Sequence, residues 1–250
     1  MADPEPFEPQ RAAPVEWPTH THWSVVLAAA HPAAPGARAA LEELCRAYWY
    51  PVYAYIRCRG HAPPDAEDLT QAFFLHLLTT EGLIGATPER GRFRGFLRTS
   101  VDHFMVSAWR RENASRRGGG VTFLSWEGDG AEDRYQTEEV DQLTPELLFE
   151  RSWADTLLAR VLGRLQEDLA CQGKAHLFEA LKDRLVDDVD APPYAELARR
   201  LGTTEPTLKM TVVRLRGRYR EVLQREIAHT VASPDEIDDE LRHLLSVLRG

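Results

Sequence analysis

The residues best suited to chemistry in this chain are arginines and lysines, in a protein of 250 residues with a formal net charge of −9. Eight basic and four acidic residues lie between positions 194 and 227. Guanidinium and ammonium groups pair with phosphate oxygens, and a guanidinium can also donate two hydrogen bonds to one guanine. A basic segment in an acidic protein therefore favours a polyanionic partner, and nucleic acid is the first candidate.

Residues 194–223 have the pattern of two helices joined by a tight turn. The first helix is short, and Gly202 follows it, where a left-handed backbone conformation costs least. Thr204 is expected to cap the second helix, with Pro206 in its first turn. One side of the second helix is predicted to be buried, because its apolar residues recur at steps of three and four. These residues are Leu208, Val212, Leu215, Tyr219 and Leu223.

The second helix of this unit is the predicted reading element for duplex DNA. In helix-turn-helix proteins such a helix enters the major groove, and Arg214 is expected to pair with a base there. Met210 and Gly217 are less usual on a groove-facing side, so the preferred DNA sequence stays open. A helical hairpin with a solvated basic face is the structural alternative. The candidate contact residues are Thr207, Lys209, Met210, Val213, Arg214, Arg216, Gly217, Arg218 and Arg220.

A second basic segment, residues 90–117, has eight basic and two acidic residues and mixes the arginines with aromatic rings. Rings beside cations suit unstacked bases and a single-stranded backbone. For Phe93, Phe96 and Trp109, burial in the core is an equally good interpretation. The inward stripe of this helix is predicted to be Leu97, Val101, Phe104 and Ala108. The candidate nucleic-acid contacts are Arg92, Phe93, Arg94, Arg98, His103, Trp109, Arg110 and Arg111.

Residues 63–78 predict a helix with an acidic outer surface. Its predicted core stripe consists of Ala66, Leu69, Phe73 and Leu77. The other side carries the candidate protein-binding residues Asp65, Glu67, Asp68, Gln71 and Leu75. A leucine among exposed acids and amides is typical of a docking face, although a solvated acidic surface explains the charges equally well.

Composition and patterning predict an all-α fold in which a flexible acidic linker joins two helical domains. A disordered tail is expected over residues 1–18, a first helical domain over 19–117 and the acidic linker over 118–143. The second domain, with the helix-turn-helix, is expected over 144–227, and an amphipathic helical extension over 228–250.

Several classes of function are disfavoured by the sequence. No apolar run approaches the roughly 20 residues that cross a bilayer, and the acidic, proline-rich start MADPEPFEPQ is unlike a signal peptide. A cytoplasmic protein without membrane insertion is therefore expected. No motif of a phosphate-binding loop, zinc hydrolase or serine hydrolase is present, so no enzyme activity, catalytic residue, metal site or cofactor is predicted. The three cysteines are far apart and are expected to be buried free thiols.

Three segments, in this order, resemble the extracytoplasmic-function group of bacterial RNA polymerase sigma factors. They are ELCRAYWYPVYAYIRCRGHAPPDAEDLTQAFF at residues 43–74, GRFRGFLRTSVDHFMVSAWRRE at 91–112, and YAELARRLGTTEPTLKMTVVRLRGRYREVLQREI at 194–227. The similarity is collinear and covers most of residues 20–230.

The resemblance implies a role for each segment. The acidic helix face would dock on core RNA polymerase, and the linker would pass toward the active-site cleft of the polymerase. The segment at 90–117 would bind and open the downstream (−10) promoter element, and the helix at 206–220 would bind the upstream (−35) element. Implied partners are core RNA polymerase, promoter DNA and an anti-sigma factor. Self-regulation by the C-terminal extension could replace that factor if the extension masks the basic helix, although packing on the second domain is the simpler expectation.

Two other functions fit the same residues. A helix-turn-helix regulator that never joins the polymerase would bind duplex DNA tightly by itself and would not need the face at 63–78. A protein–protein adaptor would use both basic segments on acidic partners, and its binding would depend on salt and not on DNA sequence.

Overall fold

The computed structural model describes residues 23, 37–77, 92–114, 130–138, 143–186 and 192–249. In these ranges the chain forms helices joined by turns and contains no strand, which confirms the predicted all-α fold for this part of the protein. None of the described helices is both long enough and apolar enough to span a bilayer. The helices are α2 (Ala37–Cys58), α3 (Pro63–Leu77), α4 (Phe93–Ala114), α5 (Ala131–Thr137), α6 (Pro145–Cys171), α7 (Ala175–Leu181), α8 (Asp183–Val186), α9 (Tyr194–Arg200), α10 (Glu205–Thr230) and α11 (Ile237–Arg249).

The two longest helices begin at threonine caps. The Thr144 hydroxyl accepts a hydrogen bond from the Leu147 amide at 3.2 Å, and the Thr204 hydroxyl accepts one from the Thr207 amide at 3.4 Å. Such caps satisfy amides that have no partner inside the helix. Gly202, in the turn before α10, has a φ of 63°, where a residue with a Cβ is disfavoured. The predicted start of α10 and the turn at Gly202 are therefore confirmed, and α6 begins where the second domain was expected to begin.

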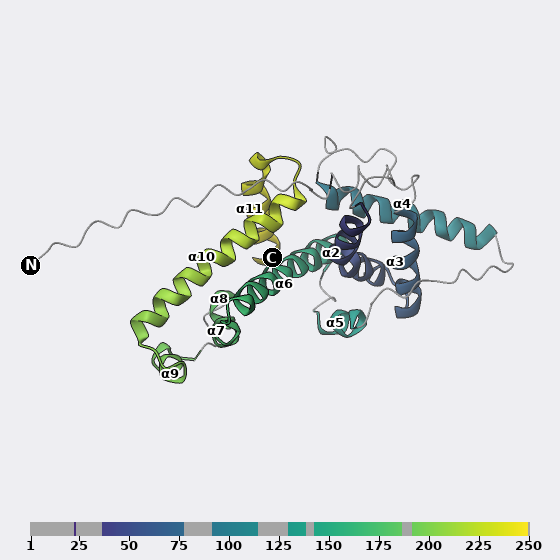
Figure 1. Ribbon diagram of the computed structural model, residues 1–250. Coiled ribbons are helices and arrows are strands. Elements are labelled where there is room, and N and C mark those ends of the chain that lie inside the picture. Colours follow the sequence, from purple (N-terminus) through teal and green to yellow (C-terminus); the bar gives the residue numbers. More distant parts are fainter. Residues whose placement is uncertain are drawn as a thin grey trace, which may run out of the picture.

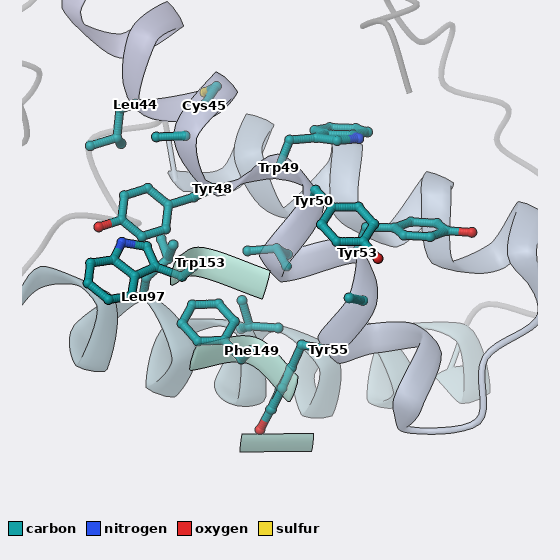
Figure 2. Packing of buried hydrophobic residues seen from close by; sticks show 14 of the residues in the cluster. Leu44, Cys45, Tyr48, Trp49, Tyr50, Tyr53, Tyr55, Leu97, Phe149 and Trp153 are labelled. Carbon is teal, nitrogen blue, oxygen red and sulfur yellow. The ribbon is translucent and has the colours of Figure 1, made fainter. Parts of the chain in front are cut away.

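α2 is the central helix of the larger hydrophobic core. Its residues 52–56 are fully buried, as expected for a stretch of helix that is apolar on every side. Aromatic side chains of α2 and α6 meet in this core, and the rings of Tyr55 and Phe149 pack edge to face with centroids 6.0 Å apart (Figure 2). α3 adds Phe73 and Leu77, and α4 adds Leu97.

A second hydrophobic core lies where α7, α8 and α9 gather around one end of α6 and α10 (Figure 1). α6 and α10 have 27 and 26 residues, which correspond to lengths of about 40 Å each. They lie side by side and supply residues to both cores. α6 places Trp153 in the first core and Leu165 in the second, while α10 places Ile227 in the first and Leu208 in the second. Residues from the predicted second domain thus contribute to both cores.

α5 lies inside the segment that was predicted to be an acidic linker, and it packs on α2. Glu132 of α5 accepts hydrogen bonds from Arg57 and from the Tyr53 hydroxyl, both on α2. The Arg134 guanidinium stacks on the Tyr50 ring, 3.7 Å from its centroid. The predicted disordered tail at residues 1–18 and the remaining linker residues, 118–129 and 139–142, lie outside the described residues.

The C-terminal extension is helical and amphipathic, as predicted, and ends in α11. Leu244 and Val247 are buried in the first core, whereas Leu248 is exposed. α11 packs against α6 and α10, near the end of α10 that lies in the first core (Figure 1). The outer face of the first half of α10 stays exposed, so α11 does not cover it in this structure and instead packs on helices of the predicted second domain, which was the simpler of the two expectations.

Candidate nucleic-acid interface

The α9–α10 unit is held in place by the second core. Leu197 and Ala198 of α9 pack against Leu208, Val212 and Leu215 of α10, and all five side chains are buried. Tyr219 and Leu223 continue the same stripe in partly buried positions, Tyr219 against the second core and Leu223 against the first. The predicted inward face of α10 is therefore confirmed, and the opposite face must point to solvent.

That opposite face combines apolar and basic side chains. Met210 is 51% exposed and Val213 is 60% exposed, and both are large hydrophobic residues. Thr207, Arg214 and Arg220 are also exposed, and neither arginine forms an ion pair with any described residue. Lys209 pairs with Glu205 at 2.7 Å and lies 5.4 Å from the centroid of the Tyr194 ring. The structure thus brings seven of the nine predicted residues together on one accessible surface, because Gly217 lies on the same side as Met210 and Val213.

The other two candidates on α10 make contacts within the protein. Arg216 donates two hydrogen bonds to the backbone carbonyl of Arg184, at 2.7 and 3.1 Å. Arg218 donates a hydrogen bond to the Gln172 side chain at 3.3 Å and lies 3.6 Å from Asp168. These contacts join α10 to α8 and to the end of α6. Gly217 has open space around the position that a Cβ would occupy.

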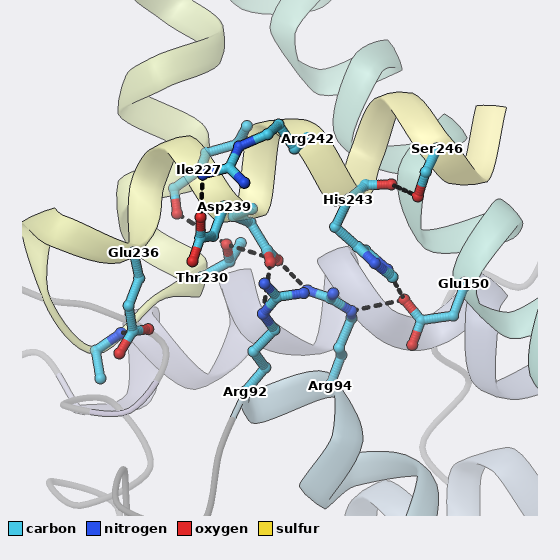
Figure 3. A network of polar contacts seen from close by, with 12 residues as sticks. Arg92, Arg94, Glu150, Ile227, Thr230, Glu236, Asp239, Arg242, His243 and Ser246 are labelled. Carbon is cyan, nitrogen blue, oxygen red and sulfur yellow. Dashed lines mark hydrogen bonds and ion pairs between the residues drawn. The ribbon is translucent and has the colours of Figure 1, made fainter. Parts of the chain in front are cut away.

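The prediction that Phe93 and Arg94 contact nucleic acid is wrong for this structure, because both side chains are buried. The Phe93 ring lies between Trp23 and Tyr48, with centroid distances of 5.5 and 5.4 Å. Arg94 is only 3% exposed. Its guanidinium pairs with Glu150 at 2.6 Å and with Glu240, as Figure 3 shows. The core interpretation of Phe93 is therefore the correct one, and the beginning of α4 belongs to the fold.

Arg92 and His243 extend the same network of charges. Arg92 is one-third exposed and pairs with Glu240 at 2.9 Å, so this candidate contact is also engaged within the protein (Figure 3). The His243 imidazole lies 2.9 Å from Glu150 on the other side of Arg94. Two carboxylates and two guanidiniums in alternation offset one another's cost of desolvation, which an isolated buried charge could not do.

The rest of α4 keeps part of the predicted surface. Leu97, Val101 and Phe104 are buried and Ala108 packs against the core, so the predicted inward stripe is confirmed. His103 and Arg110 are exposed, and Arg98 is half-buried. The side chains of Trp109 and Arg111 lie outside the described part of the structure. The accessible basic surface of this helix is thus smaller than the sequence predicted.

α3 has the two-sided arrangement expected from its sequence. Ala66, Phe73 and Leu77 are buried and Leu69 packs against the core. On the other side Asp65 and Asp68 are exposed, Glu67 and Gln71 are half-buried, and Leu75 is 55% exposed. The structure therefore brings together all five candidate protein-binding residues on one side of the helix.

Sequence reasoning missed the buried carboxylates that connect the helices. Glu226 of α10 is buried and pairs with Arg160 and Arg164 of α6, at 3.2 and 2.7 Å. Glu240 of α11 is fully buried between Arg92 and Arg94. Their positions in the sequence could have revealed them. Both glutamates fall at helical spacing within an apolar stripe, where a charged residue requires an ionic partner.

Histidine, cysteine and acidic side chains, the types that bind metal ions, also occur in the described residues. No three of their histidine, cysteine, aspartate and glutamate side chains are placed to hold a metal ion. Cys45 is buried, and burial with a smaller effect from Glu42 raises the pKa of its thiol to about 12. Cys58 is only partly buried and Cys171 is exposed, so the expected burial of all three cysteines holds fully only for Cys45.

Comparison of the chain with protein-family models, with curated proteins and with solved structures gives no match.

Proposed function

We propose that this protein is a sigma factor that binds core RNA polymerase and directs promoter-specific initiation of transcription. The observation that carries the proposal is the outer face of α10. Met210, Val213, Arg214 and Arg220 are exposed there, and the two arginines have no ion-pair partner among the described residues. In this proposal α9 and α10 are a helix-turn-helix, and α10 binds the upstream (−35) element in the major groove.

The outer side of α3 supports the polymerase part of the proposal. Exposed Asp65 and Asp68 would meet basic residues of the polymerase, and the exposed Leu75 would lose its contact with water on docking. A regulator that works without the polymerase has no need for this combination. The order of the three resembling segments along the chain supports the same assignment.

The two cores would then serve two tasks, although the predicted second domain contributes residues to both of them. The first core carries α3 for docking and α4 for the downstream (−10) element. Arg98, His103 and Arg110 are the candidate residues on the described surface of α4 that could still contact this element. Trp109 and Arg111 stay predictions. The second core holds α9 and α10, which would bind the upstream (−35) element. The polymerase supplies the chemistry of RNA synthesis, so the protein needs no catalytic residue, and this function places it in the cytoplasm.

The proposal is tested by measuring binding of the purified full-length protein to promoter duplexes, with and without core RNA polymerase. We expect weak binding by the protein alone and much tighter, sequence-dependent binding when the polymerase is present. Tight binding by the free protein that the polymerase does not change would instead identify a conventional DNA-binding regulator. Salt-dependent binding to acidic proteins without preference for any DNA sequence would identify an adaptor.

A further inference from the structure

The outermost line of α10 is apolar. Successive residues turn by about 100° in an α-helix, so residues spaced by three, four and seven share one side. Met210, Val213 and Gly217 follow this spacing and lie opposite the buried residues Leu208 and Leu215. The part of the helix that projects furthest from the protein therefore carries two hydrophobic side chains and one glycine.

Basic residues flank this apolar line on both sides. The same rotation places Arg214 on one flank and Arg220 on the other. Neither Met210 nor Val213 can donate a strong hydrogen bond, whereas both arginines can donate several. The exposed face thus has a centre without hydrogen-bond donors and two cationic margins.

The major groove of DNA has the complementary arrangement. A helix in the groove meets base edges along its centre, and negatively charged phosphate backbones lie on either side. Among the groups on the base edges, the thymine C5 methyl is the apolar one. Gly217 has no side chain to hold the backbone away from the groove, and beyond the adjacent helix backbone no described atom lies within 4 Å of the position that a Cβ would occupy.

We propose that Met210 and Val213 select thymine methyl groups in the upstream promoter duplex, while Arg214 and Arg220 bind phosphates on its two walls. This inference rests on the proposed function and specifies the DNA chemistry that α10 recognises. It replaces the expectation that Arg214 carries specificity by pairing with a base. Sequence preference then comes from apolar contacts, and the cations contribute affinity that does not depend on sequence.

Deoxyuridine provides the direct test, because it differs from thymidine only by the missing methyl group. The full-length protein with core polymerase first selects duplexes from a pool randomised over the upstream element. Each thymine of a selected duplex is then replaced singly by deoxyuridine, and the dissociation constant is measured. Removing a contacted methyl is expected to weaken binding about fourfold, the effect of one buried methyl-sized group.

Variants of the protein connect each methyl to its side chain. With Met210→Ala or Val213→Ala, deoxyuridine at the contacted position should cause no further loss, because the apolar contact is already gone. Both side chains are exposed, so these variants should unfold at the same temperature as the wild-type protein. Leu245→Ala, which removes an exposed leucine on α11, is the matched control and should leave the deoxyuridine effect unchanged.

Two contrary outcomes are distinguishable. If the polymerase complex binds promoters specifically but deoxyuridine has no effect at any position, the thymine inference is overturned and the proposed function stands. The same holds if the effect persists unchanged in both α10 variants. If the protein confers no promoter binding on the polymerase, the proposed function fails and the inference fails with it.

Discussion

Arg94 and Glu240 form a buried ion pair although they are 146 residues apart in the sequence. Arg94 lies at the beginning of α4, and Glu240 comes from α11 in the C-terminal extension (Figure 3). Arg94 also pairs with Glu150 of α6, and its guanidinium lies 4.4 Å from the centroid of the Trp153 ring. The C-terminal helix is therefore an integral part of the first core.

Glu240→Ala is expected to destabilise the protein by about 3–5 kcal/mol, because it removes the buried partner of Arg94, which keeps only Glu150, and the carboxylate that pairs with Arg92. The free energy of unfolding can be measured with denaturant. Asp239→Ala is the matched control, since Asp239 pairs with Arg242 at the surface and should change stability by less than about 1 kcal/mol. Equal stabilities of the two variants would contradict a structural role for the buried pair.

Asp68→Arg is expected to abolish binding to core RNA polymerase and promoter-dependent transcription while the fold remains intact. The substitution places a cation on an exposed acidic surface that is proposed to meet basic residues. Circular dichroism and polymerase capture on the immobilised protein measure the two effects. Glu167→Arg, an equal change of charge at an exposed position of α6, should retain polymerase binding. Normal capture and transcription by Asp68→Arg would exclude docking through this face.

Arg214→Ala is expected to weaken binding of the polymerase complex to all upstream sequences to a similar extent. If Arg214 neutralises one phosphate, the slope of log K against log salt should fall by about 1. Binding to the selected duplex and to single-base variants of it, at several salt concentrations, measures both effects. Arg249→Ala, at the exposed end of α11, is the control. A loss confined to one base pair would show instead that Arg214 reads a base.

The contact between α5 and α2 is expected to weaken in acid. Hydrogen bonds from Arg57 lower the pKa of Glu132 from 4.5 to about 2, with smaller contributions from Tyr53 and Gln136. Because the pKa is lower in the folded protein, the unfolded chain binds the proton more readily. This contribution to stability is complete above about pH 4.5 and is lost as the pH falls toward 2.

Glu132→Gln should remove this contribution. The difference in unfolding free energy between wild type and variant is therefore expected to shrink as the pH falls from 4.5 to 2. Equilibrium unfolding at a series of pH values measures that difference. Glu179→Gln, at an exposed position on α7, is the control and should show a smaller pH dependence. A constant difference between wild type and Glu132→Gln across this range would mean that the carboxylate is not held by Arg57.

Much of the local structure could be predicted from residue type and spacing. Helix caps such as Thr204 and stripes such as Leu208, Val212 and Leu215 depend on neighbours within one or two turns, so a single sequence contains the necessary information. For the same reason the outer side of α3 and most of the outer side of α10 could be predicted, whereas the contacts of Arg216 and Arg218 with other helices could not.

The position of the charged network could not be predicted in the same way. Arginines at the start of α4 look alike in the sequence whether they face DNA or a carboxylate from a distant helix. Which of them is buried depends on how α4, α6 and α11 pack together, and Glu240 and Arg94 meet only through that packing. The sharing of α6 and α10 between two cores is likewise a property of tertiary structure, because helical periodicity shows that a stripe is buried but not against which partner.

The proposal that this protein directs promoter-specific initiation is tested most directly by run-off transcription with purified core RNA polymerase. The templates are the DNA upstream of the protein's own coding sequence and the duplexes selected by the complex. We expect a discrete transcript that requires the protein, is absent with core polymerase alone, and is lost with Asp68→Arg but retained with Glu167→Arg. Unchanged transcript patterns with and without the wild-type protein on every template would contradict the proposal.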